Sequence, residues 1–177
     1  MEIQNKKSLA KDKLEFVSSI ITDKEGKILV FIRRENLKLD PGKYDFCSGH
    51  IKEGEIPLQA MYRELGEELG VRPEQIKRLN FIGAIETPHK KFPQTLTYMY
   101  DIQLNLSNEI DEMINKVPEP ELQEVKHVKD VQTLRNILEE SRKFRTISTY
   151  EFEIVLKEME NRINKRKEEE IKTCEER

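Results

Sequence analysis

A cluster of carboxylates is the strongest chemical signal in the sequence. Glu64, Glu67 and Glu68 fall at i, i+3 and i+4, so on a helix they share an arc of roughly 100°. Carboxylates one turn apart repel each other, and they lie near the negative end of the helix dipole. Clustered hard oxygens are the ligands that Mg²⁺ and Mn²⁺ prefer. The spacing therefore indicates a divalent-cation site, and without a metal the same residues would form a solvated acidic face.

The helix that carries this cluster is predicted over about residues 57–69. Pro57 suits the first helical position and Gly70 suits the residue just past the end. Apolar side chains recur between them at i, i+3, i+7 and i+11, namely Leu58, Met61, Leu65 and Leu69. These four fall within one narrow stripe. The glutamates are therefore expected at the edge of a buried face.

The spacing of the whole segment resembles the Nudix box, G-x5-E-x7-R-E-U-x-E-E-x-G-U, in which U is aliphatic. Every fixed position matches between Gly49 and Val71. The resemblance implies a Nudix hydrolase, in which the box forms a loop–helix–loop that holds Mg²⁺ or Mn²⁺ against a diphosphate. It also implies an α/β/α sandwich with a mixed β-sheet between helices.

The resemblance also assigns roles within the box. Glu64, Glu67 and Glu68 would be metal ligands, and one of them would act as the general base; which one stays open. The carbonyl of Gly49 would be a further ligand. Glu55 and Arg63 match positions that brace the loop against the helix, and the resemblance implies that they orient the metal ligands.

An extra carboxylate from a distant loop could complete the metal site. Glu121, just before a predicted strand, is the first candidate, with Glu119 and Glu86 behind it. Each of the three could equally be an ordinary surface acid.

Five residues are candidates for substrate contacts. Arg33 and Arg34 end a predicted strand and could contact phosphate, although both could simply end that strand in solvent. His89 and Lys90 lie on a basic loop that could cover the phosphates. Phe46 could stack a base, although aromatic residues on strands are commonly part of a core.

The residues that precede the box suggest an alternative. The pattern PG-x-[aromatic]-D followed by GH and GE resembles the Nudix branch related to isopentenyl-diphosphate isomerase. Those isomerases carry a cysteine directly before the Gly-His, where this chain has Ser48. Cys47 is displaced by one residue, so it is predicted to face the other side of a strand as a small buried residue. None of the three histidines lies upstream of the box, whereas the isomerases draw metal-binding histidines from there. An isomerase is therefore the less favoured prediction.

The order of predicted elements fits an α+β or α/β sandwich. Strands are predicted at 14–22, 27–33, 44–51, 79–86, 94–104 and 121–128, and helices at 57–69, 131–140 and about 148–164. The first two strands are separated by a four-residue turn, which predicts a β-hairpin. Asp130 is a suitable N-cap for the helix that follows it. The last helix could cover the core or pair two subunits, which leaves a homodimer open.

Composition favours a single domain over 1–177, with a polar N-terminal arm at 1–13 and a charged C-terminal tail at 165–177. The net charge is −3, and residues 49–71 alone carry five acidic and two basic side chains. The remainder is balanced, so no extended nucleic-acid surface is expected. With no long apolar run and two cysteines, we expect a cytoplasmic protein without a membrane segment.

These observations predict a metal-dependent hydrolase that cleaves a diphosphate bond in a nucleoside diphosphate derivative or a related compound. Its partner would be a small-molecule diphosphate. The alternatives are an isopentenyl-diphosphate-isomerase-like enzyme, RNA 5′-end processing, which the absence of a basic stripe disfavours, and a non-catalytic nucleotide-binding Nudix module.

Overall fold

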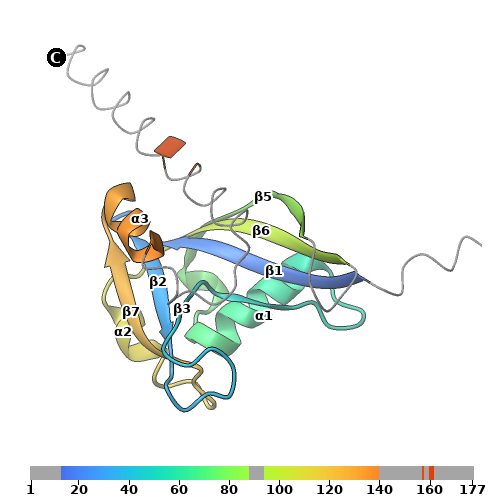
Figure 1. The fold of residues 1–177 in the computed structure, drawn as a ribbon, viewed down its shortest axis with the longest axis horizontal. Helices are drawn as coiled ribbons and strands as arrows, with labels where there is room; N and C mark the ends of the chain where they lie inside the picture. The colour runs from blue at the N-terminus through green and yellow to red at the C-terminus, as the bar shows by residue number, and fades with distance from the viewer. Residues whose placement is uncertain (1–12, 88–93, 140–156, 158–159, 162–177) are drawn as a thin grey trace, which may run out of the picture.

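A mixed β-sheet forms the centre of the computed structural model, which describes residues 13–87, 94–139, 157, 160 and 161. Its strands are β1 (Lys13–Thr22), β2 (Ile28–Arg33), β3 (Tyr44–Asp45), β4 (Ser48–His50), β5 (Ile76–Thr87), β6 (Gln94–Leu104) and β7 (Leu122–Val128). The helices are α1 (Pro57–Leu69), α2 (Glu109–Met113) and α3 (Val131–Glu139), with a short 3-10 turn, η1, at Pro73–Gln75. Within the described residues the sheet has seven strands in the order β3-β2-β1-β6-β5, with β4 added to β1 and β7 added to β2 (Figure 1).

Strand pairing is mixed, and one predicted pair is much shorter than expected. β1 runs parallel to β6 from Lys13↔Gln94 to Thr22↔Gln103, whereas β5 and β6 are antiparallel. The predicted hairpin between β1 and β2 pairs only at Thr22↔Ile28. The two strands diverge beyond that point because β1 continues beside β4 and β6, while β2 pairs with β3 and β7 (Figure 1).

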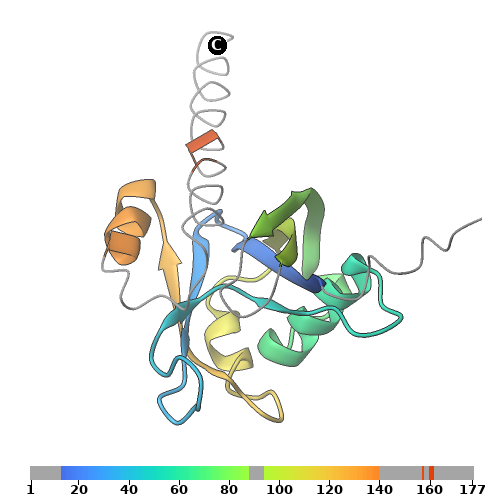
Figure 2. The ribbon, with the colours of Figure 1, turned by 45° about the vertical axis from the view of Figure 1, so that its right-hand side comes forward.

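Helices cover both faces of the sheet, which confirms the expected sandwich (Figure 2). Along β2, Leu29 and Phe31 belong to a core cluster shared with α1 and α2, whereas Ile28 and Val30 belong to a second cluster that includes Leu134 of α3. Alternate residues of a strand point to opposite faces. The continuous apolar run of β2 is therefore explained by burial on two sides.

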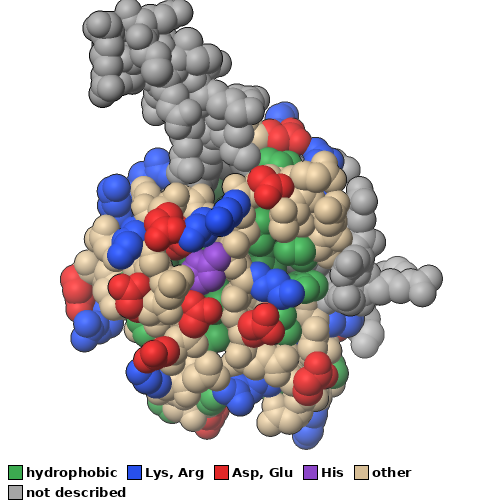
Figure 3. Space-filling model, turned by 90° about the vertical axis from the view of Figure 1, so that its left-hand side faces the viewer, with side chains coloured by type: hydrophobic (Ala, Val, Ile, Leu, Met, Phe, Trp, Pro, Cys, Tyr) green, Lys and Arg blue, Asp and Glu red, His purple; other side chains and the backbone are tan. Residues whose placement is uncertain are grey.

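The face formed by α3 and β7 carries charges of both signs, interspersed rather than gathered (Figure 3).

Among the helices that the structure describes, none combines the length and apolar composition needed to cross a bilayer.

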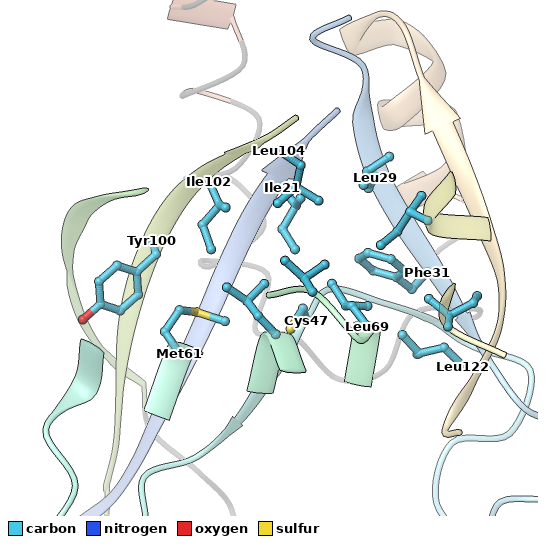
Figure 4. Packing of buried hydrophobic residues seen from close by; sticks show 14 of the residues in the cluster. Ile21, Leu29, Phe31, Cys47, Met61, Leu69, Tyr100, Ile102, Leu104 and Leu122 are labelled. Atoms are coloured by element: carbon cyan, nitrogen blue, oxygen red, sulfur yellow. The ribbon is translucent and has the colours of Figure 1, made fainter. Parts of the chain in front are cut away.

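The box helix α1 begins and ends where the sequence predicts. Gly70 takes a left-handed φ of 68°, and its N–H donates to the carbonyl of Gly66. Met61, Leu65 and Leu69 are fully buried, and Figure 4 shows Met61 and Leu69 directed at strand residues and at Cys47. The fourth member of the predicted stripe does not fit. Leu58 is 40% exposed, because the buried face has turned toward two other residues, Ala60 and Glu64.

The remaining expectations have mixed outcomes. β6 and α3 match their predicted ranges closely, and Asp130 caps α3 by accepting a hydrogen bond from the Thr133 N–H at 2.7 Å. The predicted strand 44–51 is divided into β3 and β4. Three predicted features lie wholly or mostly outside the described residues: the arm 1–13, the helix 148–164 and the tail 165–177.

Candidate active site

Arg63 joins the loop that follows β4 to the helix α1. Its Nε and Nη2 donate to the two carboxylate oxygens of Glu55 at 2.7 and 2.9 Å, and Nη2 also donates to the carbonyl of His50 at 2.7 Å. The hydrogen bonds from Arg63 to Glu55, together with one from the Lys52 N–H, lower the pKa of Glu55 to about 2. The contact has the geometry expected of a brace, because a planar guanidinium that grips both oxygens fixes orientation as well as distance.

Glu64 packs directly against Gly49. Only 8% of Glu64 is exposed, and a Cβ built on Gly49 would lie 1.9 Å from its Oε1. A side chain at position 49 would therefore displace this carboxylate. Burial raises the pKa of Glu64, while hydrogen bonding and charge attraction from Arg63 oppose that rise.

Glu68 lies on the inner side of α1, against β4. Its Oε2 accepts a hydrogen bond from the Ser48 N–H at 3.3 Å, and the Cys47 thiol lies close enough for the two groups to affect each other's pKa. Burial raises the pKa of Glu68 to about 8, and the negative charges of Asp45, Glu64 and Glu121 contribute to the rise.

The position of Cys47 corrects part of the sequence interpretation. It is fully buried, as expected of a small core residue. However, it lies in the core cluster on the α1 face, where burial and then the negative charge of Glu68 raise the pKa of its thiol. Cys47 lies between β3 and β4, where the predicted strand is interrupted. Its carbonyl accepts hydrogen bonds from both the N–H and the hydroxyl of Ser19. Displacement by one residue therefore does not carry this thiol away from the box glutamates.

Glu67 is the outermost of the three clustered glutamates. Its side chain is 54% exposed, and Arg63 Nη1 donates to it at 2.9 Å while the Lys52 ammonium lies 3.4 Å away. Arg63 Nη1 also donates to Glu64 at 2.5 Å. In the part of the chain that the structure describes, no three carboxylate, imidazole or thiol groups converge on a single point. The donor types at this edge, carboxylates beside a backbone that carries no side chain, nevertheless fit Mg²⁺ or Mn²⁺.

Arg33 does not lie where the sequence interpretation expected it. Its side chain is buried, and Nη1 lies 3.3 Å from Asp45 and 3.1 Å from Glu121. A guanidinium enclosed and paired in this way is not presented to a phosphate, which corrects the expected substrate contact. Asp45 is a member of this cluster that sequence reasoning missed, although it is the aspartate of the PG-x-[aromatic]-D pattern.

Two further substrate candidates are engaged within the fold. Arg34 donates from Nε to the Leu122 carbonyl at 3.1 Å and from Nη2 to the Asn115 side chain at 2.7 Å. Phe46 is 3% exposed and packs in the cluster on the α3 face, so neither face of its ring is open to a base. The last two candidates, His89 and Lys90, lie outside the described residues.

Fold and site together define an α/β/α domain organised around an acidic loop–helix–loop. The NUDIX domain family matches residues 15–150, so the chain belongs to this family, as the box predicted. It is a Nudix hydrolase domain.

The curated proteins that match the chain in sequence include one with a short, closely similar segment. A segment of 36 residues is 61% identical to an RNA pyrophosphohydrolase from Psychromonas ingrahamii, and it spans 20% of this chain and 20% of that protein. The chain thus spans about a fifth of the length of this curated relative.

Two solved structures share the fold at low sequence identity. A MutT protein from Methanosarcina mazei Go1 has a TM-score of 0.56 and 18% identity, over 88% of this chain and 98% of that one. The NUDIX domain of Shewanella oneidensis NrtR, solved with ADP ribose, has a TM-score of 0.53 and 15% identity, over 78% and 92% of the two chains.

Proposed function

We propose that this protein hydrolyses a diphosphate bond in a nucleoside diphosphate derivative or a related small molecule, with Mg²⁺ or Mn²⁺ as cofactor. The observation that carries the proposal is the packing of Glu64 against the bare backbone of Gly49, with Glu68 beside it on the same helix. Carboxylates on an ordinary solvated helix face would lie in water. Glu64 and Glu68 instead point inward, and burial raises the pKa of both.

The residues proposed to hold the metal are Glu64, Glu67, Glu68 and the carbonyl of Gly49, with Glu121 as an additional ligand. A divalent cation bound there would neutralise phosphate charge and activate water for attack on phosphorus. Glu64 and Glu68 would ionise fully in its presence, because a nearby positive charge reverses the effect of burial on a carboxyl pKa.

The protein contributes orientation through Arg63. Two of the three clustered glutamates, Glu64 and Glu67, accept hydrogen bonds from this guanidinium, which is itself fixed by Glu55. We infer that Arg63 keeps Glu64 and Glu67 close to their working positions before the cation binds. One of the box glutamates also serves as the general base that accepts a proton from the attacking water.

The test is phosphate release with Mg²⁺ or Mn²⁺ from a substrate panel. The panel contains nucleoside triphosphates, ADP-ribose, nucleotide sugars, dinucleoside polyphosphates, a 5′-triphosphorylated RNA and isopentenyl diphosphate, with a phosphatase coupled where needed. We expect a metal-dependent hit that is lost in Glu68→Gln and retained in Glu74→Gln, an acid on η1.

The other outcomes select among the alternatives. Hydrolysis of the RNA alone would extend to this chain the activity in the name of its local relative. Isomerisation of isopentenyl diphosphate without phosphate release would favour the isomerase-like enzyme. Metal-dependent binding of ADP-ribose without turnover of any compound would favour the non-catalytic nucleotide-binding module.

A further inference from the structure

We propose that Arg33 and Arg34 act together as positioning residues that fix Glu121 beside the box helix. This inference rests on the proposed function, since it concerns the extra carboxylate of the same site. It replaces the expected phosphate contact of the two arginines with a different role.

Arg33 holds the side chain of Glu121. The guanidinium is almost fully enclosed, with 4% of the side chain exposed, and its Nη1 contacts Glu121 at 3.1 Å and Asp45 at 3.3 Å. Nη2 donates to the Leu39 carbonyl at 3.5 Å, and Nε has no hydrogen-bond partner in the described part of the chain. A buried N–H without a partner costs free energy. The position of the guanidinium is therefore explained by its contacts with the two carboxylates, and these leave one of its own N–H groups without a partner.

Arg34 holds the backbone carbonyls of Glu121 and of the next residue. Its N–H donates to the Glu121 carbonyl at 2.8 Å, and its Nε donates to the Leu122 carbonyl at 3.1 Å. Side chain and main chain at position 121 are thus gripped by consecutive residues at the end of β2.

The pairing of β2 with β7 brings the two partners together. Ile32 pairs with Glu124 but Arg33 pairs with Leu122, so β7 has one extra residue at this point. Such a bulge bends a strand and redirects a side chain, and bulges are enriched beside active sites. In a regular antiparallel register Arg33 would pair with Gln123, so the bulge brings Glu121 one position closer to Arg33 along the ladder.

Glu121 is brought toward the box by the same cluster. Asp45, which contacts the same Arg33 nitrogen, lies three residues before Ser48, whose N–H donates to Glu68 at 3.3 Å. Arg33 neutralises the charge of Asp45. The side chain of Glu121 is 51% exposed, so it can still offer an oxygen to a cation.

A double-mutant cycle with Arg33→Lys and Glu121→Gln tests this inference. Lysine keeps the charge but not the fork that contacts two carboxylates. Each single variant should lower kcat or Mn²⁺ affinity by about 10- to 100-fold, as is typical for residues that orient a metal site. The KM should change little, because an arginine that bound phosphate directly would act mainly on KM. The double variant should be no worse than Glu121→Gln alone.

Mn²⁺ affinity, measured by the paramagnetic resonance signal of the free ion, gives a readout that does not depend on turnover. Arg78→Lys is the matched control, because Arg78 pairs with Asp101 at 3.0 Å on β5 and β6. It should leave both kcat and Mn²⁺ affinity unchanged. If Arg33→Lys fails to fold, Glu121→Gln still tests the proposal, since it leaves the buried Arg33–Asp45 pair intact.

Two results would overturn the inference alone, in a wild-type protein that is active. These are additive losses in the double variant, or a Glu121→Gln protein with unchanged kcat and Mn²⁺ affinity. A wild-type protein that neither hydrolyses the panel nor binds Mn²⁺ would instead overturn the proposed function, and this inference with it. A wild-type protein that binds Mn²⁺ without turnover would leave the affinity cycle to decide.

Discussion

At the scale of single residues, Gly49 shows how a missing side chain can define a site. Its φ is not left-handed, so the backbone itself does not demand glycine. The demand is steric, because a Cβ would overlap the Glu64 carboxylate at 1.9 Å from Oε1 and 2.1 Å from Cδ. The glycine of the box is therefore explained by the glutamate that packs on it.

We predict that Gly49→Ala abolishes most metal-dependent activity. Glu64 must move by an ångström or more, and a displacement of that size can cost roughly 100-fold in rate. Steady-state kinetics on the best substrate of the panel provide the measurement. Gly83→Ala is the control, since a Cβ there would meet nothing within 4 Å. Normal kinetics for Gly49→Ala would show that Glu64 does not need this position.

Glu68 predicts a characteristic pH dependence of the metal-free protein. Its pKa is about 8 in the folded chain, against an ordinary value of 4.5. The fold thus favours the protonated carboxyl, and this contribution to stability is complete below pH 4.5 and lost as the pH rises through 8. Glu68→Gln cannot ionise, so its melting temperature should gain on the wild type between pH 5 and pH 9.

Adding Mg²⁺ should reverse that ranking at pH 8. The cation binds the folded wild type and stabilises it by mass action, whereas Glu68→Gln should show little such gain. Thermal unfolding with and without Mg²⁺ measures both effects. A metal-free Glu68→Gln protein that melts well below the wild type at pH 8 would mean that this carboxylate is structural.

At the scale of elements, α1 contains a glycine whose missing side chain is required neither for packing nor for ending the helix. Gly66 is exposed in the last turn of the helix, and a Cβ there would meet only the Val71 carbonyl at 3.9 Å. We predict that Gly66→Ala stabilises the protein by up to about 1 kcal/mol, because alanine loses less backbone entropy in a helix. Urea denaturation measures the change, and kcat should stay the same.

Gly54→Ala is the informative comparison. Space around Gly54 is open, but its φ is 84°. Alanine there should destabilise the protein, since a left-handed backbone is unfavourable for a residue with a Cβ. Equal effects of the two substitutions would argue that backbone conformation does not control stability in the box.

At the scale of the whole molecule, His127 ties three separate segments. Its Nδ1 lies 3.0 Å from Asp23, in the turn after β1, and its Nε2 lies 3.0 Å from Asp111 on α2. His127 itself belongs to β7, so sheet, turn and helix meet at one imidazole. Asp23 is completely buried and also accepts hydrogen bonds from the N–H groups of Glu25 and Lys27 at 2.9 Å.

We predict that His127→Ala destabilises the protein by about 1–3 kcal/mol, since a buried carboxylate loses a partner. Asp111→Ala should cost less, because the Asp111 side chain is 43% exposed and water can replace it on the other ring nitrogen. Chemical denaturation of the two variants compares them directly. Equal losses of stability in the two variants would contradict the view that the contact with Asp23 contributes more than the contact with Asp111.

Short-range features of the molecule were predictable from the sequence. Apolar periodicity with Pro57 and Gly70 defined α1, and the range of β6 followed from its own residues. The spacing of the box identified the family and the group of glutamates because both lie within one helix and its flanking loop. In such a segment, sequence distance and spatial distance remain closely related.

Long-range features were decided by the tertiary structure. The parallel partner of β1 is a strand some eighty positions away, and a bulge in β7 sets which residue faces Arg33. The burial of Phe46, the exposure of Leu58 and the raised pKa of Glu68 all depend on which surfaces meet when the sheet and helices pack. Strand pairing and desolvation arise from contacts between distant segments, and no local pattern of residues encodes them.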